Sequence, residues 1–310
     1  MGSDTLVTNL SAELKAVNPK RIFIAYSGGV DSSVLLHGVH QLKLDVPVFA
    51  IHIHHGLSKY ADDWLKHCQL NCDVLSIELL AHKVTLNLPV NAQASVQANK
   101  ESQVSGIEKA AREARYEVFE HHLNAGDVLL MGHHQDDQIE TFMIRLMRGS
   151  GLTGLTAMDK TRAVGNGQLL RPLLNTSRQQ IEAYAAQQQI KFIEDDSNTN
   201  TDFDRNWWRL SLLPLMQDRF SQSSQSILKT IEILQDEHQL LNDLLEPVYQ
   251  TMVDAQGCLI NQKLSEQSMS IQCQVIRKWL EQHGLYPLLA HKQIQTVIDD
   301  VLNARLDAEP

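Results

Sequence analysis

The sequence predicts an α/β protein in which an open parallel sheet carries helices on both faces and a small all-helical domain follows. Short apolar runs alternate with helical patterns in the first part of the chain, which is typical of a parallel sheet. The chain has 310 residues, 43% of them hydrophobic, which is enough for a buried core and for two domains. We therefore expect domains at 1–216 and 223–310, joined by the polar stretch at 217–226.

Three apolar runs predict buried strands: RIFIAY at 21–26, VPVFAIHI at 46–53 and DVLLMGH at 127–133. Each run is short and is bounded by polar or turn residues, as buried strands usually are. A weaker run, DVLSIEL at 73–79, predicts a fourth strand. These strands would form the parallel sheet.

Helical periodicity fills the segments between the strands. Apolar residues recur at spacings of three and four in 106–123 and in 136–149. A third helix is expected to start near Thr176, because Thr176 and Gln179 fit a capping box. The polar stretch 91–105 is expected to form a mobile loop.

The end of the chain is predicted to be helical because its apolar residues fall in helical stripes. These stripes are Ile227, Ile231, Leu234, Leu241, Leu244 and Leu245; then Val275, Ile276, Trp279 and Leu280; then Ile294, Val297, Ile298, Val301 and Leu302.

Composition excludes some classes of protein. The formal net charge of −10 argues against a protein that coats nucleic acid, although a local basic groove is compatible with it. No apolar stretch reaches the roughly 18 residues that span a bilayer, and the N-terminus does not read as a secretion signal. We therefore expect a cytoplasmic protein with no membrane contact. The four cysteines do not form the two pairs of a four-thiolate zinc site and are expected to be ordinary thiols.

The stretch SGGVDS at 27–32 follows a predicted strand and leads into a predicted helix. Glycine lets backbone N–H groups approach an anion, and a helix N-terminus adds partial positive charge, so this loop can cradle phosphate. It lacks the lysine of Walker-type loops. Asp31 would repel phosphate unless a divalent cation lies between them, which suits a nucleotide with Mg²⁺. A plain Gly-Gly turn is the alternative.

A second glycine-rich stretch, GSGLTG at 149–154, matches the dinucleotide fingerprint in letters only. That fingerprint must follow a strand and open a helix, whereas this stretch follows a predicted helix. We therefore interpret it as a helix end followed by a loop.

The stretch MGHHQDDQIET at 131–141 follows another strand and opens a helix, where open α/β sheets place ligands. Asp136, Asp137 and Glu140 can face one site, and carboxylates gathered there favour a cation such as Mg²⁺. His133 and the following His134 could donate to phosphate or position a base. The alternative is that the acids complement the helix dipole and the histidines belong to the core.

Histidines and arginines supply two further candidate sites. His52, His54 and His55 could hold zinc, but their spacing at a strand end puts them on different faces. Arg112 and Arg115 share a helix face, and Arg205 and Arg209 flank two tryptophans. Arginine holds carboxylate or phosphate in a fork and tryptophan stacks on bases, although surface charge and core packing are the ordinary alternatives.

Taken together, these motifs resemble the bacterial tRNA(Ile)-lysidine synthetases. SGGVDS is the motif of the N-type ATP pyrophosphatases, and GMP, NAD and argininosuccinate synthetases and tRNA thiolases share it. The remaining matching stretches occur in order: HIHHGLS, EKAAREARY, GHHQDDQIETFMIRLMRGSGLTGL, RPLL and EDDSNTNTDFDRNWWR. The third of these is the most specific. The resemblance implies a PP-loop fold of the adenine nucleotide alpha hydrolase type.

The resemblance also implies a function. Enzymes of this family are ligases that use ATP to adenylate the C2 oxygen of the wobble cytidine in tRNA(Ile) with a CAU anticodon. The side-chain amine of free L-lysine then displaces AMP and gives lysidine. On this basis residues 1–216 would be the catalytic domain and 223–310 a helical tRNA-binding domain.

Site residues follow from the resemblance position by position. ATP would bind at Ser27, Gly28, Gly29, Val30, Asp31 and Ser32, and Mg²⁺ at Asp31 and Asp136. The catalytic residues would be Asp31, His133, Asp136, Asp137 and Glu140, and the substrate-binding residues Arg112, Arg115 and Arg205.

The chain departs from the family pattern in a few places. Ser58 replaces a common arginine, Gly132 a common alanine, and Trp207 and Trp208 more polar residues. The family's tRNA contacts near 58 and 207 are therefore not carried over to this chain. Larger family members carry a further C-terminal domain. A tRNA thiolase and a nucleotide-binding module without chemistry remain alternatives, and a homodimer is one assembly left open.

Overall fold

The computed structural model describes residues 3–56, 58–86, 100–195, 199–284 and 291–302. The chain divides into two compact units, Met1–Glu232 and Ile233–Pro310. The division falls within the long helix α11 (Ser223–Met252).

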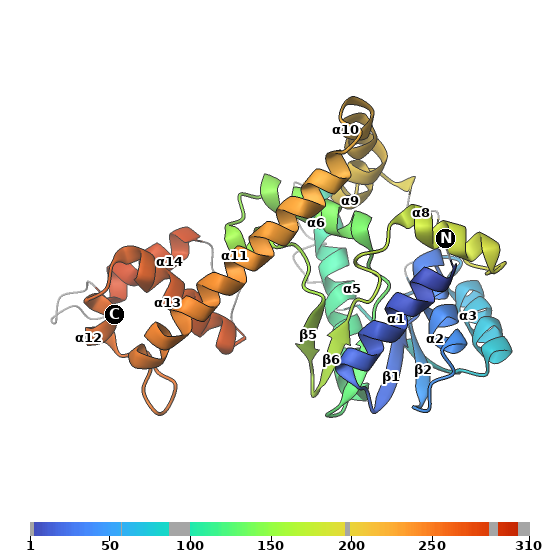
Figure 1. Cartoon of the computed structure of the whole chain (residues 1–310), viewed down its shortest axis with the longest axis horizontal. Helices are drawn as coiled ribbons and strands as arrows, with labels where there is room; N and C mark the ends of the chain where they lie inside the picture. The colour runs from blue at the N-terminus through green and yellow to red at the C-terminus, as the bar shows by residue number, and fades with distance from the viewer. Residues whose placement is uncertain (1–2, 57, 87–99, 196–198, 285–290, 303–310) are drawn as a thin grey trace. The chain divides into compact units, whose positions relative to one another are not determined.

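The first unit is built on a six-stranded sheet with the order β3-β2-β1-β4-β6-β5 (Figure 1). All neighbouring strands are parallel except β5, which pairs antiparallel with β6 at the edge. The predicted parallel sheet is thus confirmed, with one antiparallel strand added. The strands are β1 (Arg21–Ala25), β2 (Val48–His54), β3 (Glu78–Lys83), β4 (Asp127–Leu130), β5 (Thr161–Val164) and β6 (Gly167–Leu170).

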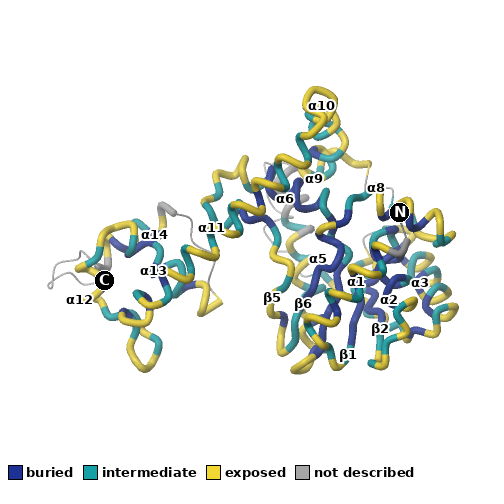
Figure 2. Tube along the Cα trace, viewed as in Figure 1, coloured by how far each residue is buried: buried dark blue, intermediate teal, exposed yellow. Residues whose placement is uncertain are grey.

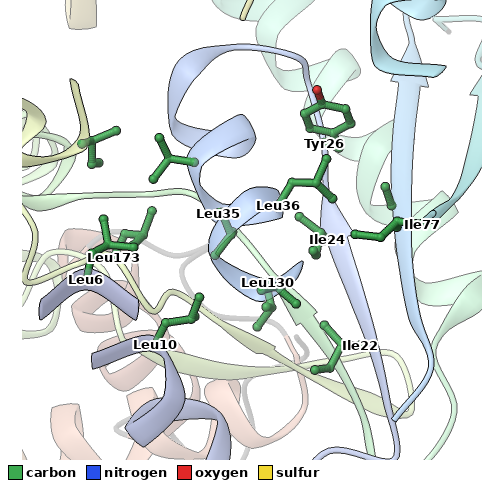
Figure 3. Close-up of a cluster of buried hydrophobic side chains, with 14 of the residues drawn as sticks. Leu6, Leu10, Ile22, Ile24, Tyr26, Leu35, Leu36, Ile77, Leu130 and Leu173 are labelled. Atoms are coloured by element: carbon green, nitrogen blue, oxygen red, sulfur yellow. The ribbon is translucent and has the colours of Figure 1, made fainter. Parts of the chain in front are cut away.

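Helices cover both faces of the sheet because residues on a strand alternate between its faces. Ile22 and Ile24 of β1 pack in one cluster with helices α1 (Ser3–Val17), α2 (Val30–Gln41), α3 (Ala61–Leu75) and α8 (Arg178–Gln187) (Figure 3). Phe23, between them, packs in a second cluster with Phe119 of α5 (Lys100–His122). The central strands β1 and β4 are mostly buried, as Figure 2 shows for β1, whereas the edge strand β3 has no buried residue.

Three element boundaries differ from the predictions. The strand predicted at 73–79 is wrong in its first half, because α3 runs to Leu75 and Ser76 ends it in a left-handed conformation. Helix α8 is capped by Ser177 and Gln180, one residue after the predicted pair. The predicted loop at 91–105 lies outside the described residues up to 99, and from Lys100 onward the chain is helical.

The second unit is helical, as predicted. Besides the end of α11 it contains α12 (Asn261–Ser265), α13 (Met269–Gln282), α14 (His291–Val297) and the π-helix η3 (Ile298–Leu302). Its buried core includes Leu245, Tyr249, Leu264, Val275, Ile276, Leu280, Ile294 and Ile298. In the parts of both units that the structure describes, no helix combines the length and the apolar character needed to cross a membrane.

Candidate functional site

The two motifs that sequence analysis singled out meet at the carboxyl ends of β1 and β4. These strands are neighbours in the middle of the sheet, and the strand order reverses between them. Loops at such a switch point diverge and leave room for a ligand. The two loops touch, because a Cβ built on Gly132 would lie 3.1 Å from the carbonyl carbon of Asp31. SGGVDS and MGHHQDD therefore form one site.

The conformation of the SGGVDS loop is fixed by local hydrogen bonds. Ser32 Oγ donates to the carbonyl of Gly29 at 3.0 Å, and Ser33 Oγ donates to that of Gly28 at 3.2 Å. Gly29 caps α2 without a side-chain hydrogen bond. The first-turn amides of α2 thus face no side-chain acceptor of their own cap, and such amides suit an anionic ligand.

His134 connects the two motifs. It caps α6 (Gln135–Met147), where its main-chain N–H donates to Asp137 Oδ2 at 3.0 Å and the N–H of Asp136 donates to its Nδ1 at 3.3 Å. Its Nε2 lies 3.7 Å from Asp31 Oδ1 and 3.6 Å from Asp137 Oδ2. Burial lowers the pKa of His134, but the carboxylates of Asp136, Asp137 and Asp31 raise it by more, so the net shift is upward.

Arg178, the first residue of α8, contacts both Asp31 and Asp136. Its Nη1 lies 2.9 Å from both carboxylate oxygens of Asp31, and its main-chain N–H donates to Asp136 Oδ1 at 3.2 Å. Burial raises the pKa of Asp31 more than His134 and Arg178 lower it. The pKa of Asp136 is lowered, first by its hydrogen bond with His134.

Arginines from a later segment neutralise the other two acids. Glu140 is fully buried, and Arg209 grips it through Nε at 2.7 Å and Nη2 at 3.1 Å. The same Nη2 lies 3.4 Å from Asp137 Oδ1, and Arg205 Nε lies 3.5 Å from Glu140 Oε2. Arg205 belongs to α9 (Asp204–Trp207), and Arg209 to the π-helix η2 (Trp208–Leu212) that continues it.

These neighbours set the pKa values of the two acids in opposite directions. Burial raises the pKa of Glu140 more than Arg209 lowers it. Burial also raises the pKa of Asp137, but His134, His133 and Arg205 lower it by more. The surroundings therefore favour the ionised form of Asp137 more strongly than that of Glu140.

His133 is hydrogen-bonded to an arginine. Its Nδ1 accepts a hydrogen bond from Arg171 Nε at 3.3 Å. Burial lowers its pKa to about 3, and nearby Arg171, Arg205 and Arg115 act in the same direction, against the influence of Asp137. At neutral pH this ring is uncharged.

Arg115 has no acidic partner among the residues that the structure describes. Its Nε and the Nδ1 of His55 are both buried and lack a hydrogen bond. Burial lowers the pKa of His55 to about 4, with Arg115 the next cause, so the two side chains are close and only Arg115 is charged at neutral pH. A buried cation without a counter-charge is costly, which favours an anionic ligand at this place.

The other expected residues occupy varied surroundings. Arg112 is exposed and stacks over the ring of Tyr116 at 5.1 Å. Trp208 is buried and Trp207 is exposed, with their rings in a T-shaped contact. The stretch GSGLTG follows α6 and forms the short helix α7 (Leu152–Leu155), which agrees with its interpretation as a helix end.

Sequence analysis did not select Arg171 or Arg178, and it named His134 and Arg209 as candidates without assigning them to the site. The signal available was a charge argument. Three acids packed at one helix start need cations close by. Which arginines supply them depends on contacts between residues far apart in the sequence.

The residues present fit a magnesium ion only in part. Within the described chain, no group of three or more His, Cys, Asp and Glu side chains could hold a metal ion. Asp31 and Asp136 both contact Arg178, the first through its side chain and the second through its main-chain N–H. Mg²⁺ is commonly bound by one or two carboxylates plus phosphate oxygens. A zinc site at His52, His54 and His55 is not supported, since His52 bonds to the Tyr26 carbonyl and His54 pairs with Asp62.

Comparison with known proteins identifies the two parts of the chain. Residues 3–216 match the PP-loop domain family, and residues 261–310 match the TilS substrate binding domain. The chain is 38% identical to the tRNA(Ile)-lysidine synthase of Serratia proteamaculans, across all of this chain and 68% of that protein. It is 40% identical to the tRNA(Ile)-lysidine synthase of Yersinia pseudotuberculosis, across 94% of this chain and 62% of that protein.

A solved structure shares the fold. The U34-tRNA thiolase NcsA from Methanococcus maripaludis, solved with its [4Fe-4S] cluster, superposes with a TM-score of 0.58 and 17% identity over 75% of this chain and 79% of that one. At this identity the likeness speaks only to the fold. The family matches and the curated relatives carry the assignment: the chain belongs to the tRNA(Ile)-lysidine synthase family of PP-loop proteins.

Proposed function

We propose that the protein is a tRNA(Ile)-lysidine synthase. It would adenylate the C2 oxygen of the wobble cytidine in tRNA(Ile) with a CAU anticodon, and free L-lysine would then displace AMP. The observation that carries this proposal is the contact between the SGGVDS loop and the acid cluster, where Asp31 and Asp136 share Arg178. The chain spans roughly two thirds of its curated relatives, 68% and 62% of the two named above, so the activity of the whole protein is part of the proposal.

ATP would bind on the loop at Ser27–Ser32, with its phosphates at the start of α2. PP-loop membership supports ATP as the nucleotide. Asp31 and Asp136 would hold Mg²⁺ together with the phosphates, and the ion would supply positive charge to the triphosphate. The chemical gain is that AMP leaves far more readily than a ring carbonyl oxygen.

Asp137 would handle the lysine amine. Free lysine has a side-chain pKa near 10.4, so its amine must lose a proton before it attacks. The pKa of Asp137 is lowered, so its carboxylate is ionised at neutral pH and can orient the ammonium group. As a weak base it would relay the proton of the ammonium group to water and not keep it. Glu140 lies beside it but is buried under Arg209, and we assign it to shaping this acidic side of the site.

The positive side of the site would bind substrate anions. Arg115 offers a buried guanidinium without a counter-charge in the described chain, and Arg112 and Arg205 lie near enough to lower its pKa further. A carboxylate or phosphate oxygen of the substrates would satisfy it. The helical residues 223–310 would contact the tRNA, in line with the family match over 261–310. We also propose a cytoplasmic location, where the tRNA is found.

The thiolase alternative lacks support from the cysteines. Cys68 and Cys72 are buried, and burial raises the pKa of each to about 12, so neither is a thiolate at neutral pH. Sulfur transfer and cluster binding both need thiolates.

The proposal is tested by incubating the full chain with ATP, labelled lysine and tRNA(Ile) bearing a CAU anticodon. Label should enter the tRNA only when all three are present. Asp137→Ala should abolish the incorporation, and its unfolding curve should show that it is folded. Incorporation by Asp137→Ala near the original rate would refute the role of Asp137, and no incorporation by the unaltered chain would refute the proposed function.

A further inference from the structure

The SGGVDS loop contains no basic residue, yet a guanidinium from another helix lies on it. Arg178 Nη1 lies 2.9 Å from both oxygens of Asp31, and Arg178 Nε donates to Glu182 at 2.7 Å. Arg178 Nη2 makes no hydrogen bond within the described part of the chain. About a third of the Arg178 side chain, 35%, is exposed to solvent, as is 30% of Asp31. The arginine is thus at the loop and partly accessible to a ligand.

The main chain of Arg178 is fixed there independently of its side chain. Ser177 and Gln180 form a capping box that sets the start of α8. The N–H of Arg178 donates to Asp136 Oδ1, so the residue is attached to the second motif as well. Its guanidinium can therefore change partner without a shift of the helix.

Charge favours a phosphate group as the alternative partner of the Arg178 guanidinium. A triphosphate brings several negative charges to a loop whose one charged side chain, Asp31, is itself an anion. In Walker-type loops a lysine meets this charge. Arginine binds phosphate oxygens through a planar fork, and such charge-assisted hydrogen bonds are stronger than neutral ones.

We propose that Arg178 is a phosphate-binding residue of the nucleotide site and supplies the cation that the SGGVDS loop lacks. Its guanidinium binds phosphate oxygens of the nucleoside triphosphate and of pyrophosphate. Without nucleotide it rests on Asp31. This inference depends on the proposed function only in taking the loop as a nucleotide site; it needs neither lysine nor tRNA.

A simpler role for Arg178 makes a different prediction. If Arg178 only neutralises Asp31, its loss leaves a bare carboxylate that repels phosphate, and removing that carboxylate should restore binding. If Arg178 contacts phosphate directly, its loss should weaken binding whether or not residue 31 is charged. A double-mutant cycle over Asp31 and Arg178 separates the two.

The probe is inorganic pyrophosphate, and its binding to the full chain is measured by titration calorimetry in metal-free buffer with chelator. The variants are Arg178→Gln, Arg178→Lys, Asp31→Asn and the double variant Asp31→Asn with Arg178→Gln. Arg148→Gln is the matched control, because Arg148 pairs with Asp204 on the surface and lies outside the site. Arg178→Gln should weaken pyrophosphate binding about tenfold or more in both backgrounds, as expected for a lost charge-assisted contact. Arg178→Lys should lose less, and Arg148→Gln should bind like the unaltered chain.

Equal affinity of Asp31→Asn and of the double variant would overturn the proposal and leave Arg178 as a counter-ion. Should Arg178→Gln prove unfolded by circular dichroism, Arg178→Lys in the Asp31→Asn background carries the test, and unchanged affinity there contradicts the proposal. If the unaltered chain binds neither pyrophosphate nor ATP, the nucleotide site itself fails, which is distinguishable from a failure of Arg178 alone.

Discussion

Gly28 has a backbone conformation that other residues rarely adopt. Its φ is +88°, and a Cβ there would lie 2.6 Å from Ile193 Cδ1 and 3.0 Å from Cys68 Sγ. Its carbonyl accepts from the N–H of Ile193 at 2.9 Å and from Ser33 Oγ. The glycine therefore fixes how the SGGVDS loop leaves β1, and the neighbouring Gly29, with a φ of −70°, has no such strain.

Gly28→Ala should lower the free energy of unfolding by about 1–3 kcal/mol, because the left-handed conformation and the close contacts both oppose a methyl group. ATP binding should weaken with it. Urea denaturation measures the first effect. Gly29→Ala is the control, since its Cβ would meet only Ser27 Oγ at 3.5 Å, and it should change stability little. Equal losses in the two variants would show that the loop conformation is not what the glycine provides.

At individual positions, the sequence predicted one half of the site better than the other. The loop residues and the acids follow strands of one sheet, so their convergence can be expected from strand order alone. Arg178 and Arg209, which contact the acids, and Arg171, which contacts His133, come from segments further along the chain. Nothing in local spacing distinguishes these arginines from surface charges, and only the packed structure selects them.

The π-helix η2 is the element that closes the acidic side of the site. It carries Arg209 onto the fully buried Glu140, and it follows directly on α9, which carries Arg205. Short π-helical segments often occur at functional sites. A buried carboxylate held in this way depends on its partner, because removing one member of a buried pair leaves an uncompensated charge.

Arg209→Ala should therefore destabilise the protein by about 3 kcal/mol. The loss should shrink as the pH falls. The pKa of Glu140 is already raised by burial, and without Arg209 it rises further, so the folded form takes up a proton more readily than the unfolded form and gains stability on acidification. Urea denaturation at several pH values checks this.

Arg148→Ala is the control for this change, because its pair with Asp204 is largely exposed and should contribute less than about 1 kcal/mol. Glu140→Gln added to Arg209→Ala should recover part of the lost stability. A pH-independent loss in Arg209→Ala would contradict the assignment of the effect to the buried Glu140 charge.

Among the elements, long periodic segments and strongly apolar strands were predictable, and short or irregular elements were not. Strands β5 and β6 are four residues each, and β5 alternates weakly, so propensity alone does not reveal them. The Gly165–Asn166 pair between them is a hairpin signal that could have revealed both strands. The run at 73–79 reads as one strand because its apolar residues belong partly to the end of α3 and partly to β3.

For the molecule as a whole, stability should depend on pH through histidines that are buried in their neutral form. Burial lowers the pKa of His55 to about 4 and that of His133 to about 3. Unfolded histidines bind protons near pH 6.5. Between these values the unfolded state binds more protons, so stability is fully present above about pH 6.5 and falls on acidification toward pH 4.

His55→Gln should flatten this dependence. Each such histidine contributes at most about 1.4 kcal/mol per pH unit within the window. The comparison is the slope of unfolding free energy against pH for the unaltered chain and for the variant, with the exposed His121→Gln as control. If His55→Gln keeps the original slope, His55 is not a neutral buried group in the folded protein.

The same view explains how an acidic chain can act on RNA. The net charge is −10, yet Arg112, Arg115, Arg171, Arg178, Arg205 and Arg209 all lie in or beside one site. Local positive charge of this kind attracts phosphate regardless of the total. Several of these arginines pair with the acids of the site, and in the proposed function Asp137 meets the amine while Arg115 and Arg178 meet anions.

In the proposed function, one site first activates a base and then delivers an amine to it. The most direct test incubates the full chain with tRNA(Ile) and ATP labelled in its α-phosphate, without lysine, and then adds unlabelled lysine. We predict that labelled AMP becomes attached to the tRNA and is released when lysine is added, as lysidine forms. Labelled AMP that never joins the tRNA, or that stays on it after lysine is added, would contradict this account.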